Sequence, residues 1–138
     1  MNRAENVYAV ESSKELTRFV EDFIQLAGAN DFVISNKPTM DMKKTLASHG
    51  GQVTDDFDLH MMQVCKPIKA DKSLTANAER AILMPKFVHV FSAGGKTQIR
   101  YLSFGERDIR ALVEDDPTFS DSLADTTATM REMIDQAK

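Results

Sequence analysis

The chain has 138 residues, of which 42% are hydrophobic and 28% are charged, and its formal net charge is −4. This length and composition are typical of one globular domain that buries a core without disulfides or metals. An acidic chain without a long basic run is poorly suited to nucleic acid, because phosphate binding depends on clustered Lys and Arg. We therefore expect one domain over residues 1–138 and no nucleic-acid partner.

Hydrophobic segments of the length needed for a signal peptide or a membrane span, which takes about 20 apolar residues, are not recognisable in the sequence. The single cysteine, Cys65, cannot form an intramolecular disulfide or a cluster of thiolates around zinc. We therefore expect a cytoplasmic protein with a reduced thiol and no contact with a membrane.

The N-terminal region predicts a strand followed by a long helix. Residues 7–10 are β-prone, and Ser12 and Glu15 have the spacing of a capping box at a helix start. Gly28 is expected to end this helix, since glycine readily adopts the left-handed conformation of a helix end. Apolar residues recur at helical spacing between these signals: Leu16, Phe19, Val20, Phe23, Ile24 and Ala27.

Three further elements are predicted before the middle of the chain. Residues 32–35 are typical of a strand, and Thr39 is expected to begin a short helix that ends at Gly50. Residues 61–65 predict a third strand, which Pro67 ends because proline cannot donate a backbone hydrogen bond.

The second half of the chain predicts a helix and then a hairpin. The helix is expected to begin at Asp71 or Ser73 and to stop before Pro85. Residues 87–91 and 97–104 alternate in the manner of strands, and the glycines between them favour a hairpin turn.

Two helices complete the chain, over residues 106–113 and from about Asp121 onward. The apolar stripe of the last helix comprises Leu123, Met130, Met133 and Ile134. Helices that alternate with strands, followed by a hairpin, predict the α+β class. We expect a two-layer sandwich with a mixed or antiparallel sheet of about five strands and helices mainly on one face.

Two proline turns in the middle of the chain, Val64-Cys65-Lys66-Pro67 and Leu83-Met84-Pro85, identify a family. With these turns and the order of elements given above, the chain resembles the domain of unknown function 302 family over about residues 7–104. The resemblance implies a compact α+β sandwich similar to the TATA-binding-protein-like arrangement, and homodimers. It implies no established activity, and we assign no cofactor.

The chain departs from the family pattern at two positions. Family members place Asn between the Cys and Pro of the first turn, where this chain has Lys66. Many members place a second Cys directly after the second turn, where this chain has Lys86. A site of paired cysteines, for redox chemistry or for a metal, is therefore not implied for this chain.

The candidate site residues are Cys65, Lys66, Lys86 and His89. Cys65 is the only candidate nucleophile, and a neighbouring ammonium favours its thiolate form, whereas a buried structural cysteine is the alternative. If the two proline turns pack together, Lys86 joins a positively charged corner suited to an anionic or electrophilic ligand. His89 lies between two aromatic residues and joins this corner only if it shares its face.

Two functions stay open on this basis. A dimeric module that binds a small, anionic ligand or a protein partner is favoured, because no motif of a known enzyme class is recognisable. Exposed sheet edges also favour a homodimer. The alternative is a thiol-dependent enzyme or sulfur carrier centred on Cys65. No metal site is predicted, because the scattered histidines match no metal-binding motif.

Overall fold

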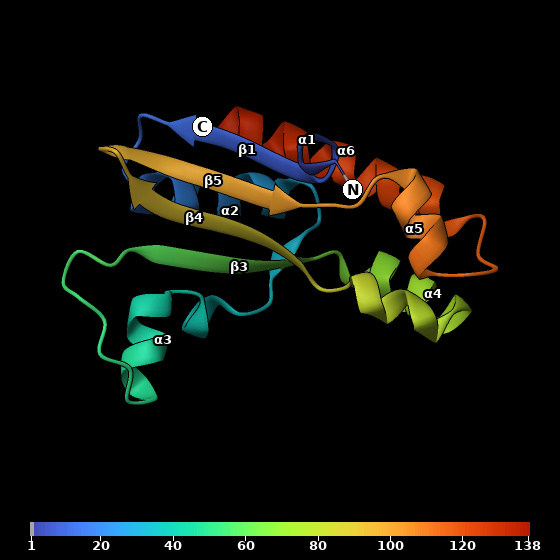
Figure 1. Cartoon of the computed structure of the whole chain (residues 1–138), viewed down its shortest axis with the longest axis horizontal. Coiled ribbons are helices and arrows are strands. Elements are labelled where there is room, and N and C mark those ends of the chain that lie inside the picture. The colour runs from blue at the N-terminus through green and yellow to red at the C-terminus, as the bar shows by residue number, and fades with distance from the viewer. Residues whose placement is uncertain (1) are drawn as a thin grey trace.

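Five strands form one antiparallel sheet in the order β1-β5-β4-β3-β2 (Figure 1). The computed structural model describes residues 2–138. In chain order its elements are α1 (Arg3–Asn6), β1 (Val7–Ser12), α2 (Leu16–Ala29), β2 (Val33–Ile34), the 3-10 helix η1 (Lys37–Thr39), α3 (Met42–Ser48), β3 (Leu59–Cys65), α4 (Pro67–Ala76), the 3-10 helix η2 (Ala78–Leu83), β4 (Lys86–Ala93), β5 (Lys96–Leu102), α5 (Glu106–Leu112) and α6 (Phe119–Ala137).

Helices α2 and α6 lie behind the sheet and cover one of its faces (Figure 1). Successive side chains of a strand point to opposite faces, and Val88 and Val90 of β4 are accordingly buried beneath these helices. Ile99 and Tyr101 of β5 are buried in the same layer. The predicted α+β fold with helices mainly on one face of a five-stranded sheet is therefore confirmed, and every strand pairing is antiparallel.

The apolar side of α2 is buried as its periodicity predicts, but both ends of the helix differ from the prediction. Ser12 belongs to β1, where it pairs with Thr97, and Glu15 precedes the helix without a side-chain cap. Gly28 lies inside the helix, which continues to Ala29. Asp31, with φ of 65°, takes the left-handed conformation that the prediction gave to Gly28.

Helix α4 begins at Pro67, four residues before the predicted start at Asp71 and six before the alternative start at Ser73, because this proline is its first residue and not only the end of a strand. The φ angle of proline suits the first position of a helix, where no backbone N–H is needed. The helix ends at Ala76, and residues 78–83 form the separate 3-10 helix η2. This early start places Lys66 and Lys69 at the N-terminus of α4.

The hairpin between β4 and β5 turns on Gly94 and Gly95, with φ of 63° and 74°. Two successive positive φ angles match the tight turn that suits the twist of paired strands. Both strands therefore extend closer to the turn than predicted. Helix α6 begins at Phe119, and its predicted apolar stripe is buried: Leu123, Met130, Met133 and Ile134.

The other face of the sheet carries no helix in Figure 1. Phe87, His89 and Phe91 of β4 project from it and are half-buried, as the alternation along β4 predicts. Leu102 at the end of β5 is 51% exposed on the same face. We refer to this surface as the open face. Among residues 2–138, no helix is long and apolar enough to cross a membrane.

Candidate functional site

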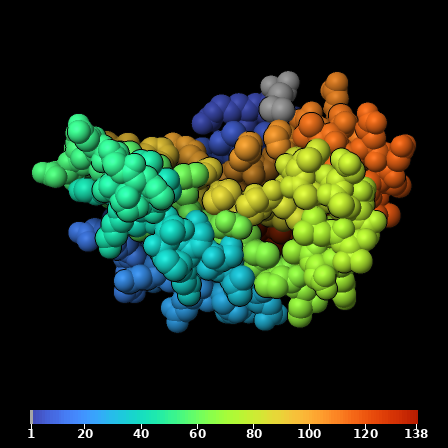
Figure 2. Space-filling model, turned by 90° about the horizontal axis from the view of Figure 1, so that it is seen from below, coloured from blue at the N-terminus to red at the C-terminus, as the bar shows by residue number. Residues whose placement is uncertain are grey.

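A cavity of about 270 Å³ lies where the end of β3, α4, η2 and the first half of α6 meet. In Figure 2 red atoms, the colour of α6, show at the bottom of a small hollow in the yellow-green surface of the α4–η2 region. Most of the wall is apolar, and both α4 and α6 contribute to it. Its larger apolar side chains are Phe32, Val64, Leu74, Met84, Phe119 and Leu123.

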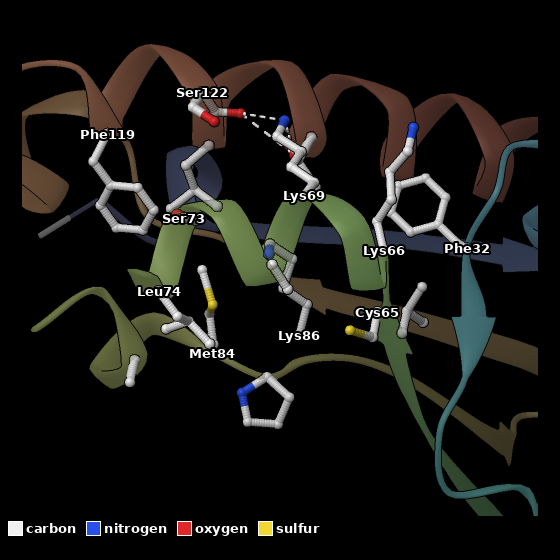
Figure 3. A pocket seen from close by; sticks show the side chains of 16 residues that line it. Phe32, Cys65, Lys66, Lys69, Ser73, Leu74, Met84, Lys86, Phe119 and Ser122 are labelled. Carbon is white, nitrogen blue, oxygen red and sulfur yellow. Dashed lines mark hydrogen bonds between the residues drawn. The ribbon is translucent and has the colours of Figure 1, made fainter. Parts of the chain in front are cut away.

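Three lysines, Lys66, Lys69 and Lys86, line this cavity, and we call it the lysine cavity (Figure 3). Lys66 and Lys69 come from the N-terminal end of α4, and Lys86 is the first residue of β4. Within the described part of the chain, no Asp or Glu lines the cavity. Three cations around an apolar wall, without a lining carboxylate, create a strongly positive potential that favours an anion.

Lys69 is fixed across the cavity to α6. Its Nζ donates to the carbonyl oxygen of Ser122 at 3.0 Å and to Thr126 Oγ1 at 2.7 Å. Burial lowers the pKa of Lys69, Asp125 on α6 opposes this change, and the positive charge of Lys66 adds to it. The side chain is thus held by two hydrogen bonds, and one of its three N–H donors is left for a ligand.

Lys86 lies in the middle of the cavity in Figure 3, and its side-chain amine has no similar partner among residues 2–138. No hydrogen bond or ion pair joins its Nζ to any residue from 2 to 138. Burial lowers the pKa of Lys86, the positive charge of Lys69 lowers it further, and the Cys65 thiol acts in the opposite direction. This amine is therefore both desolvated and available.

Lys66 stands at the rim, with its Nζ 5.2 Å from the centre of the Phe32 ring. It is the N-cap residue of α4, and the first turn of that helix holds no acidic side chain. The positive end of the helix dipole therefore adds to the charge of Lys66 and Lys69. An anion bound here would be attracted both by the lysines and by the positive end of the helix dipole.

Cys65 is the last residue of β3, is half-buried, and lines the same cavity. Figure 3 shows its sulfur turned toward Lys86. The two residues meet because β3 and β4 are antiparallel neighbours and Val64 pairs with Lys86. The structure therefore brings together Cys65, Lys66 and Lys86, three of the four candidate site residues expected from the sequence.

His89 lies on the open face, because it is an odd number of residues from Lys86 along β4. Its ring stacks on Phe87, with centroids 6.1 Å apart and planes inclined by 7°. It lines a second, smaller cavity of about 170 Å³, and burial lowers its pKa. His89 therefore does not line the lysine cavity, although Lys86 lines both cavities. No three His, Cys, Asp or Glu side chains among residues 2–138 are grouped to hold a metal ion.

A buried ion pair joins η2 to the loop before α6, next to the lysine cavity. The guanidinium of Arg80 binds Asp116 through two hydrogen bonds of 2.6 and 2.8 Å and donates to Ser73 Oγ at 3.0 Å. The same guanidinium lies 4.9 Å from the centre of the Phe119 ring. Arg80 also lowers the pKa of Asp116 to about 2. Because Arg80 and Asp116 bind each other, we assign both side chains a structural role and not a ligand-binding role.

Neither Lys69 nor the α6 side of the cavity was among the site residues expected from the sequence. Lys69 is three residues after Lys66, so both lie in one helical turn once α4 is known to begin at Pro67. The signal in the sequence that could have identified Lys69 was Pro67, because proline is common at the first position of a helix. The contribution of α6 could not be found in this way, since Lys69 and Thr126 are 57 residues apart.

One antiparallel sheet with helices packed on a single face and a cavity at one end defines a two-layer α+β domain. The sequence matches the family described as Domain of unknown function DUF302 over residues 8–137, and the chain belongs to this family. An uncharacterized conserved DUF302 protein from Bacillus stearothermophilus has a similar crystal structure, with a TM-score of 0.78 and 17% sequence identity. The match covers 96% of this chain and 98% of that chain, and it shows a shared fold. No curated protein matches the sequence.

Proposed function

We propose that this domain binds a small anionic ligand with an apolar body in the lysine cavity. The observation that carries the proposal is the contrast between an apolar wall and three lysines without a lining carboxylate. Binding sites for small molecules are commonly apolar cavities with a few polar groups that fix orientation. At about 270 Å³, this cavity is slightly below the usual range of ~300–1,000 Å³, so the ligand is small.

The test is a titration with hexanoate, followed by NMR chemical shifts or calorimetry. Hexanoate should bind and hexanamide, which lacks the charge, should bind much more weakly. Lys86→Met should weaken hexanoate at least about tenfold, because a hydrogen bond to a charged group contributes ~1.5–3 kcal/mol. Lys72→Met is the matched control, since Lys72 is an exposed lysine of α4 that does not line the cavity. Equal affinity for hexanoate and hexanamide would contradict the proposal.

We also propose that the protein is a homodimer formed through the open face. Half-buried Phe87 and Phe91 and exposed Leu102 offer that face an apolar surface, and a second copy could cover it. Light scattering at tens of micromolar should give twice the chain mass of 15.4 kDa. Leu102→Lys should give a monomer, whereas Leu112→Lys, at a leucine of similar exposure on α5, should not.

A second candidate function is a thiol-dependent reaction at Cys65, which the position of this thiol inside the lysine cavity favours. Such a protein would suit the reducing cytoplasm. Alkylation of native protein with iodoacetamide should then be fast and should be blocked by hexanoate. Modification only after denaturation would reject a reactive thiol and leave ligand binding as the function of the cavity.

A further inference from the structure

The three lysines of the lysine cavity are held in different ways. Lys69 is fixed by hydrogen bonds to α6, and Lys66 lies over an aromatic ring at the rim. Lys86 is the most enclosed side chain of the three, and within residues 2–138 its amine contacts no acceptor. A half-buried amine without a partner is unfavourable for folding, and such departures from polar pairing are characteristic of functional sites.

Lysine becomes a nucleophile when its amine loses the proton, and two environments promote this loss: an apolar cavity and a neighbouring cation. Lys86 has both, because the wall around it is largely apolar and the ammonium of Lys69 is close enough to repel its charge. The physical consequence is a pKa below the ordinary lysine value, as burial and Lys69 both require. A bound ligand would therefore meet a larger fraction of neutral amine than at a surface lysine.

We propose that Lys86 Nζ captures a small oxo-carboxylic acid as a covalent imine. The neutral amine adds to the ligand's carbonyl carbon, and the π electrons of the C=O bond move to its oxygen. Proton transfer from nitrogen to oxygen gives a carbinolamine, and loss of water then gives the C=N bond. No oxidant or reductant takes part, and the step reverses when water adds again.

The chemical class of the ligand follows from the different positions of the three lysines in the cavity. A carboxylate fits beside Lys66 and Lys69, where the N-terminus of α4 adds its positive end and no acidic side chain competes. The apolar wall accommodates a short hydrocarbon chain, and the ketone or aldehyde reaches Lys86. This assignment rests on the proposed binding of an anionic ligand in the same cavity, and it adds the carbonyl group.

The experiment compares 2-oxohexanoate and 5-oxohexanoate with hexanoate in the presence of sodium cyanoborohydride, which reduces an imine to a stable secondary amine. Mass spectrometry of the whole protein should show one adduct, equal to the oxo acid minus one oxygen atom, for at least one oxo acid. Peptide mapping should place it on Lys86. Hexanoate should give no adduct, but in excess it should slow labelling at least several-fold.

Variants separate the inference from its alternatives. Lys86→Arg keeps the charge but removes the nucleophile, so hexanoate binding should persist while labelling is lost. Lys72→Met, the exposed lysine of α4, should label as the unmodified protein does. Cys65→Ser should also label, because a thiol adduct of a ketone is not fixed by the reductant. Circular dichroism should show that each variant is folded.

The pH dependence supplies a second readout. Lys66 and Lys69 of α4 and Cys65 of β3 line the lysine cavity together with Lys86, and His89 lines the second cavity with it. Asp125 of α6 acts on Lys69. Labelling should reach half its maximal rate below the ordinary lysine pKa of about 10.4, because burial lowers the pKa of Lys86 most and the charge of Lys69 acts in the same direction. Hexanoate binding without any Lys86 adduct would overturn the imine and leave the proposed function intact. Absence of hexanoate binding would reject the proposed function, and adducts spread over surface lysines would reject the imine.

Discussion

Lysine side chains are treated in opposite ways at the two ends of the interface between α6 and the sheet. At the C-terminal end of α6, Lys14 has a side chain 34% exposed, and its Nζ binds Asp22 at 2.8 Å and the Ala137 carbonyl oxygen at 2.5 Å. At the N-terminal end, Lys86 lies in a cavity and has no such acceptor among residues 2–138.

The difference shows that the architecture does not force an amine to be unpaired. The same fold supplies a carboxylate and a carbonyl to Lys14, and it supplies Asp116 to Arg80 at the wall of the lysine cavity itself. Buried polar groups are normally paired because an unpaired one costs free energy. Among residues 2–138 no such acceptor contacts the amine of Lys86, so this amine can bind a ligand in the lysine cavity.

The largest expected effect comes from enlarging the lysine cavity. Phe119→Ala should reduce the free energy of unfolding by about 3–5 kcal/mol, because it removes a buried ring. It should also shift the preferred ligand to acids longer than hexanoate. Phe23→Ala is the matched control, since this ring is buried in the main core away from the cavity. It should cost a similar amount in urea unfolding and leave the chain-length preference unchanged. The milder Phe119→Leu serves if Phe119→Ala does not fold.

An effect of intermediate size is expected on the free energy of unfolding, with opposite signs for variants of Lys14 and Lys86. Lys14→Met should lower the free energy of unfolding by about 1–2 kcal/mol, because it removes two hydrogen bonds of a charged group. Lys86→Met should raise it by about 0.5–2 kcal/mol, since a desolvated amine without a partner is replaced by an apolar chain. Urea unfolding at neutral pH measures both. A loss of stability in both variants would show that Lys86 has a structural partner.

The smallest expected effect is on the pH dependence of stability, and it is confined to acidic pH. The pKa of Asp116 is about 2 in the folded protein because of Arg80, against an ordinary value of 3.8. A lowered pKa contributes stability above pH ~4 that is lost as pH falls toward ~2. Asp116→Asn should therefore make the decline in stability between these values shallower. Glu114→Gln, at an exposed carboxylate in the same loop, should leave the slope unchanged.

The sequence predicted those parts of the fold that depend on local periodicity. The stripes of α2 and α6 and the Gly94–Gly95 hairpin are properties of short segments, so one sequence is enough to recognise them. The predicted starts of α2 and α4 were wrong, because two residues suit either of two elements. Ser12 suits a helix cap or a strand, and Pro67 suits the end of a strand or the first position of a helix. Only the pairing with β5 shows that Ser12 belongs to a strand.

The site could be predicted only in part, for a related reason. The sequence made the proximity of Lys86 to Cys65 and Lys66 conditional on the packing of the two proline turns. The structure places all three residues around one cavity, and β3 pairs with β4 there. The sequence left open whether His89 lies on the same face of the sheet as Lys86. Side chains alternate along β4, so His89 and Lys86 project from opposite faces. Nothing in a single sequence indicates that Thr126 of α6 approaches Lys69, because that contact depends on long-range packing.

The strand order has a consequence for the making of the protein. The outer strands β1 and β2 are the first two strands to be synthesised, whereas their neighbours β5 and β3 come later in the chain. On the ribosome, β1 therefore has no native partner until residues 96–102 have emerged. The hairpin of β4 and β5 joins strands adjacent in sequence, so its loop closes at the least entropic cost. We therefore expect the β4–β5 hairpin to form before β1 joins the sheet, although β1 is synthesised first.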